Sequence, residues 1–236
     1  MTGKRCSHVI ITIDGPSGAG KSTVAQCLAR LLGYWYVDSG AMYRAVGWLV
    51  RERALPLDDV STIVACLERT PLALRCRDGV GEVWVDSQCV NSQLRGEAVA
   101  HAASAVATMP EVRQVITAKL RQLGCQADLV IEGRDIGTVV FPDADVKVYL
   151  DASPEERARR RAQDPAHAVS QKPRPMQTVV QALKERDHAD RTRPVSPLVA
   201  ADDAIYIDTT GMAVDEVVRE VIKIVQDRIK ELGIEN

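Results

Sequence analysis

The chain has 236 residues, of which 46% are hydrophobic and 26% are charged. This composition is typical of a globular protein and excludes a disordered one, and the length suits one large α/β domain or a core with a small insert. The formal net charge of -2 excludes a general nucleic-acid or membrane binder, because such proteins carry an excess of basic residues.

Cysteines are spread along the chain without any C-x-x-C spacing, which argues against a zinc ribbon or a thioredoxin-like motif. Several fall within apolar patterns, so we expect reduced, mostly buried thiols and a cytoplasmic protein. The short polar segment at 1–7 and the brief apolar run after it do not resemble a signal peptide or a membrane span.

The first predicted element is a buried strand, an apolar and largely β-branched run over 8–13. The residues that follow match G-x-x-x-x-G-K-[ST] without a mismatch; they are Gly15, Pro16, Ser17, Gly18, Ala19, Gly20, Lys21 and Ser22. A helical pattern comes next and ends at Gly33. Strand, glycine loop and helix together are the context of a phosphate-binding loop (P-loop), in which backbone N–H groups cradle phosphate.

We expect this loop and Thr23 to bind ATP. Lys21 would reach the outer phosphates, and the hydroxyl of Ser22 would hold Mg²⁺. An ordinary glycine-rich turn is the alternative.

A second short strand, 34–37, ends in Asp38-Ser39-Gly40, and a helical pattern opens at Ala41. At this helix N-terminus, Ser39 and Arg44 are candidates for holding a second phosphate. The alternative is that Ser39 is only an N-cap and Arg44 a solvated helix residue. On these residues alone, that alternative is favoured.

Residues 58–124 contain short strand patterns separated by turns and are predicted to form an insert with its own small antiparallel sheet. Its expected elements are a helix, three short strands and two helices, over 58–69, 72–76, 82–86, 88–90, 92–108 and 110–123. The core then consists of 1–57 and 125–236.

The alternation of strands and helices resumes after the insert. We expect strands over 129–131, 146–150 and 205–207 and helices over 153–161, 176–186 and 214–232. This alternation predicts an α/β fold with a parallel sheet covered on both faces. Ligands of such sheets bind beyond the carboxyl ends of the strands.

Charged residues stand between the strand over 129–131 and an apolar run. Glu132 resembles a Walker B carboxylate that steers Mg²⁺ through water, and Arg134 can pair bidentately with phosphate. The alternative is a buried pair between Arg134 and Asp135 that binds no ligand.

Two arginine clusters flank a proline-rich segment over 163–175. The first spans 157–161, with Lys172 and Arg174 beyond it, and the second spans 186–193. A charge run on a helix is usually a solvated face. Beside a phosphate site we favour a lid, over about 155–193, that closes arginines over transferring phosphates. No catalytic base is apparent, which suits an acceptor phosphate that is already an oxyanion, as in a nucleoside monophosphate kinase.

Together these segments closely resemble the bacterial cytidylate kinases. The blocks that carry the resemblance are IDGPSGAGKST, EGRDIGTVVFPDA, DASPEERARRR and KERDHADRTRPVSPL, and the likeness extends over nearly the whole chain. It implies a P-loop kinase core with a sheet-bearing NMP-binding insert. It also implies transfer of the γ-phosphoryl group of ATP, with Mg²⁺, to CMP or dCMP.

The resemblance further implies roles for single residues. The expected catalytic residues are Lys21, Arg134, Arg186 and Arg193, and Arg160 would join the loop in binding ATP. The CMP site would be lined by Ser39, Tyr43, Arg44, Ser104, Arg113, Arg134, Asp135, Arg186 and Asp190. A carboxylate at Asp135 would accept a hydrogen bond from the cytosine amino group and disfavour the carbonyl of uracil.

Other functions remain as alternatives: a small P-loop kinase acting on UMP or shikimate, or a GTP-dependent switch. A shikimate-type kinase would need Asp-x-Asp after the second strand, where this chain has Asp38-Ser39-Gly40. The D-x-x-G match at 78–81 lies in a predicted hairpin, and the sequence has no N-K-x-D. We expect ATP and CMP or dCMP as partners, no nucleic-acid or membrane partner, and a monomer.

Overall fold

The computed structural model describes residues 8–163, 175–231 and 233. A mostly parallel sheet runs through it in the order β3-β4-β2-β6-β1-β7-β8, with β5 paired to β4. The strands are β1 (Ile10–Asp14), β2 (Trp35–Asp38), β3 (Leu72–Arg77), β4 (Val80–Val85), β5 (Gln88–Cys89), β6 (Leu129–Gly133), β7 (Val146–Asp151) and β8 (Ile205–Asp208). Strands β2, β6, β1, β7 and β8 are parallel neighbours, which confirms the predicted α/β fold.

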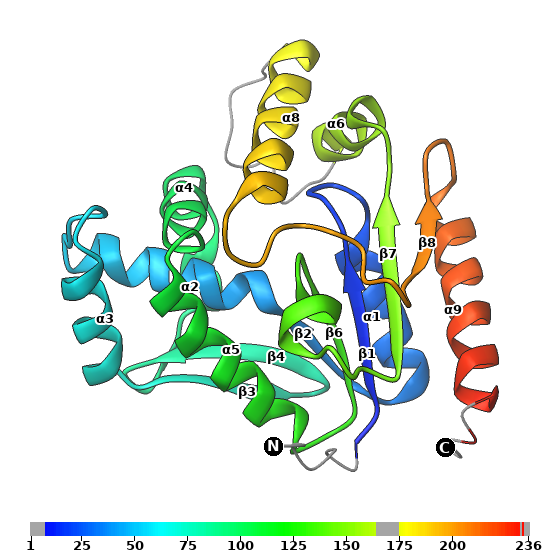
Figure 1. The fold of residues 1–236 in the computed structure, drawn as a ribbon, viewed down its shortest axis with the longest axis horizontal. Coiled ribbons are helices and arrows are strands. Elements are labelled where there is room, and N and C mark those ends of the chain that lie inside the picture. The colour runs from blue at the N-terminus through cyan, green and yellow to red at the C-terminus, as the bar shows by residue number, and fades with distance from the viewer. Residues whose placement is uncertain (1–7, 164–174, 232, 234–236) are drawn as a thin grey trace.

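Helices cover both faces of the sheet, and α6 and α8 stand beyond the carboxyl ends of its strands (Figure 1). The helices are α1 (Lys21–Leu32), α2 (Ser39–Glu52), α3 (Val60–Arg69), α4 (Glu97–Val106), α5 (Pro110–Gly124), α6 (Pro154–Gln163), α8 (Met176–Thr192) and α9 (Val214–Glu231). Two short helical turns, η1 (Asn91–Leu94) and η2 (Ile136–Val140), complete the set described.

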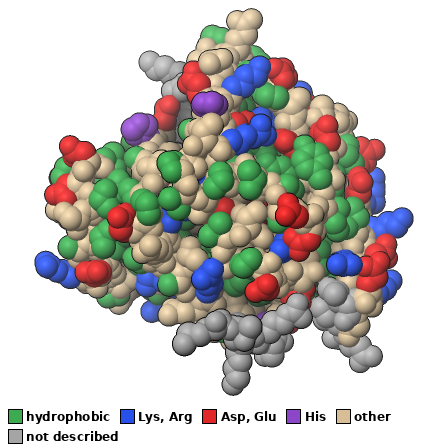
Figure 2. Space-filling model, viewed as in Figure 1, with side chains coloured by type: hydrophobic (Ala, Val, Ile, Leu, Met, Phe, Trp, Pro, Cys, Tyr) green, Lys and Arg blue, Asp and Glu red, His purple; other side chains and the backbone are tan. Residues whose placement is uncertain are grey.

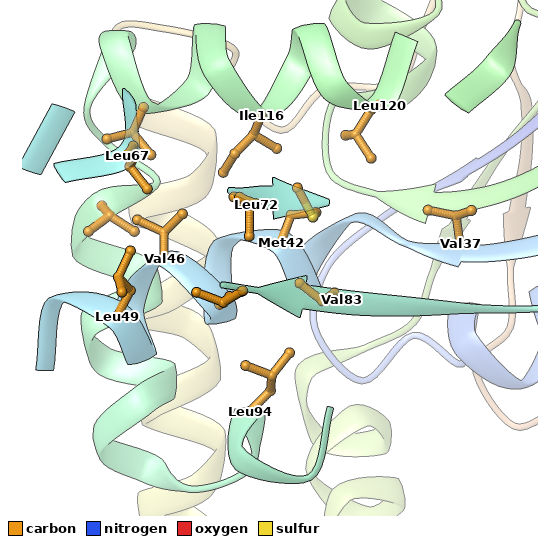
Figure 3. Close-up of a cluster of buried hydrophobic side chains, with 14 of the residues drawn as sticks. Val37, Met42, Val46, Leu49, Leu67, Leu72, Val83, Leu94, Ile116 and Leu120 are labelled. Carbon is orange, nitrogen blue, oxygen red and sulfur yellow. The ribbon is translucent and has the colours of Figure 1, made fainter. Parts of the chain in front are cut away.

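Alternating side chains along the strands separate two hydrophobic clusters. In β6, Leu129 and Ile131 join the cluster with α2, α3 and α5, whereas Val130 joins the cluster with α1 and α9. Successive residues of a strand buried on both faces are apolar, which is why the short apolar run over 129–131 predicts β6. Figure 3 shows the first cluster, into which Met42 of α2 and Ile116 of α5 both point.

The predicted insert contains three short strands, and β4 pairs antiparallel with both β3 and β5. Val80 of β4 also pairs in parallel with Tyr36 of β2. The small antiparallel sheet is thus present but continues the core sheet, so the expectation of a separate sheet is wrong. Gly96, with a φ of 119°, separates η1 from α4, so the single helix expected over 92–108 is divided.

Helices α2 and α4 approach each other closely at Gly47. A Cβ atom there would lie 2.6 Å from the backbone nitrogen of Ala103, nearer than any side chain allows. Glycine is therefore required at this crossing, which sets α4 directly against α2.

Helix α8 is longer than expected and runs to Thr192 instead of ending near 186. The second arginine cluster therefore lies mostly on the last turns of this helix. The proline-rich segment between the arginine clusters, with Lys172 and Arg174, falls largely outside the described residues.

The described cysteines differ from expectation. Four are free but partly exposed instead of buried; these are Cys27, Cys66, Cys76 and Cys89. Cys125 is disulfide-bonded, so the prediction of a reduced thiol is wrong at that position.

Acidic and basic side chains are interspersed over the face shown in Figure 2. No helix within the described ranges combines the length and apolar character needed to cross a membrane.

Candidate active site

The predicted phosphate-binding loop joins β1 to α1 at the carboxyl edge of the sheet. Gly15, Gly18 and Gly20 have φ angles of 145°, 83° and 92°, which side chains disfavour. A Cβ atom on Gly15 would lie 1.9 Å from the carbonyl oxygen of Leu150. Gly20 is the N-cap of α1, so the free N–H groups of this helix open toward the loop. The loop therefore offers backbone donors and a helix N-terminus to a phosphate.

Lys21 is buried at the first position of α1, and its Nζ donates a hydrogen bond of 2.7 Å to the carbonyl of Pro16. Burial and then the charge of Arg134 lower the pKa of Lys21 to about 7, against the opposing effect of Glu132. An incoming phosphate would favour the charged lysine. Ser22 and Thr23, the next residues of α1, are exposed.

Asp14, the last residue of β1, holds the segment that follows Asp135. Its two carboxylate oxygens accept hydrogen bonds from the backbone N–H groups of Ile136 at 2.9 Å and Gly137 at 2.7 Å. Burial raises the pKa of Asp14 to about 6. The sequence analysis missed this residue, although a carboxylate that ends an apolar strand is the same signal that pointed to Glu132.

Glu132 of β6 lies close to Lys21 and Ser22 at the start of α1. Tyr36 donates to its carboxylate at 2.6 Å, and Ser39 donates to its backbone carbonyl at 2.7 Å. Burial raises the pKa of Glu132, and the charge of Asp38 adds to the rise. The nearby hydroxyl of Ser22 acts in the opposite direction and lowers the pKa of this carboxylate. A hydroxyl beside a carboxylate is an all-oxygen donor set, which fits Mg²⁺.

A buried ion pair joins α5 to the residue that precedes η2. Nη2 of Arg113, from α5, contacts Oδ2 of Asp135, and both side chains are 5% exposed. The guanidinium of Arg113 lies 5.2 Å from the ring centroid of Tyr43 on α2, and it also donates to the carbonyl of Ala107. Nη2 of Arg193 is 3.6 Å from Oδ1 of Asp135. Four predicted CMP or catalytic residues from distant segments thus form one cluster.

A second cluster gathers arginines around Asp190 of α8. Nε of Arg134 is 3.0 Å from Oδ2 of Asp190, and Nη1 of Arg193 is 3.7 Å from Oδ1. Arg186, one turn earlier on α8, lies near Arg134. Burial and then the charge of Arg134 lower the pKa of Arg186 to about 10. Partly buried guanidinium groups that repel one another form a site for an anion such as phosphate.

Two predicted CMP residues, Arg44 and Ser104, lie outside the two clusters described above. Arg44 pairs with Asp38, the N-cap of α2, at 2.6 Å. Ser104 is exposed on α4 and donates to the carbonyl of Ala100 at 3.0 Å. Within the described residues, no hydrogen bond joins Ser104 to the pair of Arg113 and Asp135.

The first arginine cluster is not a uniform set of lid residues. Arg160 donates to the side chain of Thr209 at 2.9 Å and to its carbonyl at 2.6 Å. Arg157 is 2% exposed and donates to the carbonyl of Ser17 at 3.1 Å and to Asp187 at 2.6 Å. The expectation that this cluster closes over phosphates is therefore wrong for Arg157, which is bound within the protein.

Comparison with known proteins places these features in one family. A family model described as cytidylate kinase matches residues 11–227. Proteins described as cytidylate kinase from Solibacter usitatus (strain Ellin6076), Geobacillus sp. (strain WCH70) and Rhodococcus opacus (strain B4) are 40%, 41% and 42% identical to this chain. The alignments cover 97%, 94% and 94% of this chain and 97%, 99% and 96% of the relatives.

Proposed function

The chain belongs to the cytidylate kinase family, and we propose that it transfers the γ-phosphoryl group of ATP to CMP or dCMP, giving CDP or dCDP. The observation that carries the proposal is the arrangement of cations. Lys21 of the P-loop lies within electrostatic reach of Arg134 and Arg186. Phosphoryl transfer requires positioning and charge neutralisation, and a phosphate acceptor needs no general base.

On the donor side, the loop over 15–22 and Thr23 would hold the phosphates of ATP, with Arg160 beside them. Lys21 would neutralise charge on the transferring group, where a preorganised cation stabilises the transition state. Mg²⁺ held by Ser22, with Glu132 acting through water, would supply further neutralisation of the phosphate oxygens.

On the acceptor side, Asp135 and Arg113 would read the base. The carboxylate would accept a hydrogen bond from the N4 amino group of cytosine, and Arg113 would donate to the O2 or N3 acceptor. Uracil would place a carbonyl against the carboxylate, which leaves a buried acceptor unpaired and is costly.

The other residues of the proposed CMP site are assigned by the same reasoning. Arg134, Arg186 and Arg193 would hold the transferring phosphates, and Asp190 would hold Arg134 and contact the sugar. The remaining lining would come from Ser39, Tyr43, Arg44 and Ser104.

The proposal extends to the organisation of the chain. Residues 58–124, which carry Ser104 and Arg113, would be the NMP-binding insert, and about 155–193 the lid. We also propose that the enzyme acts as a monomer in the cytoplasm; sedimentation velocity tests the first of these two statements.

The test is ATP-dependent turnover with CMP, dCMP, UMP, AMP and shikimate as acceptors. We expect the highest kcat/KM with CMP or dCMP. A higher value with UMP or shikimate would indicate the alternative kinases. GTP binding without turnover of any acceptor would indicate a switch protein.

A further inference from the structure

One arginine connects three segments beside the P-loop. Arg157 of α6 is the largest fully buried side chain among the described residues. Its Nε donates to the carbonyl of Ala152 at 2.8 Å, its Nη1 to the carbonyl of Ser17 at 3.1 Å, and its Nη2 to Asp187 at 2.6 Å. A Cβ atom on Gly18 would lie only 3.1 Å from Cβ of Arg157, so the loop backbone also packs against this residue. A planar guanidinium holds three such partners at fixed angles.

The acidic partner belongs to the helix that carries the acceptor arginines. Asp187 of α8 is buried, and Oδ1 of its carboxylate has no hydrogen-bond partner within the described residues. Its carboxylate is therefore held by Arg157. Asp190, one turn further along α8, accepts from Arg134 at 3.0 Å, and Arg186 directly precedes Asp187. The same helix is thus tied to the P-loop by one aspartate and to the acceptor side by another.

The other ion pairs between α8 and the donor side are partly exposed: Nη2 of Arg191 lies 3.6 Å from Oδ2 of Asp151 at the end of β7, and the Arg191 side chain is 51% exposed. A crevice of about 550 Å³ lies between α8 and the ends of β7 and β8, and Arg157 and Asp187 are among its lining residues. Lys184 and Glu155 form an ion pair between α8 and α6, but both side chains are at least half exposed. Exposed pairs of this kind contribute little, whereas breaking a buried pair is costly. The pair of Arg157 and Asp187, with side chains 2% and 9% exposed, is therefore the buried ion pair that connects α6 and the loop to α8.

We propose that Arg157 and Asp187 are positioning residues that couple occupation of the P-loop to the placement of α8. Phosphate bound by the loop N–H groups fixes the loop backbone, and with it the carbonyl of Ser17 that accepts from Arg157. Arg157 then holds Asp187 and sets the position of Arg186 at the acceptor phosphate. Binding energies are reciprocal, so an acceptor on α8 also tightens the loop. The inference rests on the proposed function, because it takes ATP and CMP as the two ligands.

The test measures the dissociation constant of a non-hydrolysable ATP analogue, with Mg²⁺, by calorimetry in the absence and presence of saturating CMP. We expect the wild-type chain to bind the analogue about fivefold more tightly or better when CMP is bound. Asp187→Asn should reduce the ratio of the two dissociation constants, measured without and with CMP. The double variant Arg157→Met with Asp187→Leu should bring it close to one, and apolar replacement of a buried ion pair often preserves stability.

Glu155→Gln is the matched control, since it cuts an ion pair between the same two helices but does not touch the loop. Its ratio should equal that of the wild-type chain. A wild-type ratio near one, or a wild-type ratio retained by the folded double variant, overturns the inference. If the double variant melts at a lower temperature but keeps the wild-type ratio, the pair has only a structural role, and this result also overturns the inference.

Turnover is measured on the same preparations. No turnover of any nucleoside monophosphate by the wild-type chain overturns the proposed function and the inference that rests on it. If UMP is the better acceptor, it replaces CMP in the ratio. If the wild-type chain turns over CMP normally but binds the analogue equally well with and without CMP, the inference alone is overturned.

Discussion

Lys21 occupies a position where a charged amine is unfavourable until an anion arrives. Burial lowers its pKa from 10.5 to about 7. In the unfolded chain the amine binds its proton up to a higher pH, so between these two values the unfolded state holds more protons. Through this group, the free energy of unfolding of the ligand-free protein therefore rises as pH rises from 7 toward 10.5.

Binding of a nucleotide at pH 8 should therefore be accompanied by proton uptake. Phosphate raises the pKa of Lys21, and we expect about one proton to be taken up through this residue. Calorimetry with an ATP analogue in two buffers of different ionisation enthalpy measures the uptake. The Lys21→Met variant should take up about one proton fewer, and its kcat should fall by about 100-fold or more. Equal uptake by the two proteins would show that Lys21 is already charged.

Asp135 gives a second prediction for a single residue. Asp135→Asn keeps an acceptor for Arg113 but adds an amide donor that can face the carbonyl of uracil. Loss of a charged hydrogen bond of about 2–3 kcal/mol corresponds to roughly 30- to 150-fold in kcat/KM for CMP. We also expect the preference for CMP over UMP to narrow.

Steady-state kinetics with both nucleotides measures the change, and a melting curve checks that the variant is folded. The alternative, a purely structural pair with Arg113, predicts lower stability at an unchanged preference. An unchanged ratio in the folded variant would remove Asp135 as the reader of the base.

Among the helices, the crossing of α2 and α4 connects packing to the proposed acceptor site. Helix α2 carries Ser39 and Tyr43, and α4 carries Ser104. The two helices meet at Gly47, where the backbone of Ala103 leaves no room for a side chain. The separation of these helices therefore depends on one missing methyl group.

Gly47→Ala should push α4 away from α2. We expect a loss of about 1–3 kcal/mol in the free energy of unfolding, because overpacking forces the backbone to shift. The KM for CMP should rise more than the KM for ATP, since the donor loop lies on other elements. Urea unfolding and kinetics measure both effects. Arg51→Ala, an exposed change on the same helix, should alter neither; a fully stable Gly47→Ala would contradict the packing argument.

At the scale of the whole molecule, basic side chains gather at one edge of the sheet although the net charge is small. The net charge is -2, and both signs are interspersed over the face in Figure 2. Arg113, Arg134, Arg186 and Arg193 nevertheless converge beyond the carboxyl edge of one continuous sheet. We therefore expect a local positive field for anionic substrates at this edge, without an overall basic charge.

Raising the ionic strength from about 0.02 M to 0.2 M should therefore increase KM for CMP and ATP by about threefold or more, because salt screens this field. The kcat should change less, since bound phosphates displace the solvent ions. Kinetics in a KCl series, with Mg²⁺ held constant, measures the effect. KM values that do not respond to salt would show that the convergent arginines do not guide the substrates.

The local features of this protein were predictable from the sequence. The P-loop, the strands on either side of it and the long helices follow from glycine positions, apolar runs and caps that depend only on neighbours in the chain. The resemblance also indicated that Arg113 and Asp135 share a site, although 22 positions separate them. The extension of α8 to Thr192 and the break between η1 and α4 were not predicted, because helix ends depend on the packing around them.

Only the tertiary structure decided which partners meet. The sequence placed Arg157 among several lid arginines, whereas the structure pairs it with Asp187. It gave Asp14 no role, whereas the structure shows this carboxylate accepting two N–H groups from η2. The pairing of β2 with β4, which joins the insert to the core, is likewise a contact between strand edges far apart in sequence. Periodicity shows that a side chain is buried or that an edge can pair. It does not show the partner, because that depends on distances through space that only the assembled sheet and helices set.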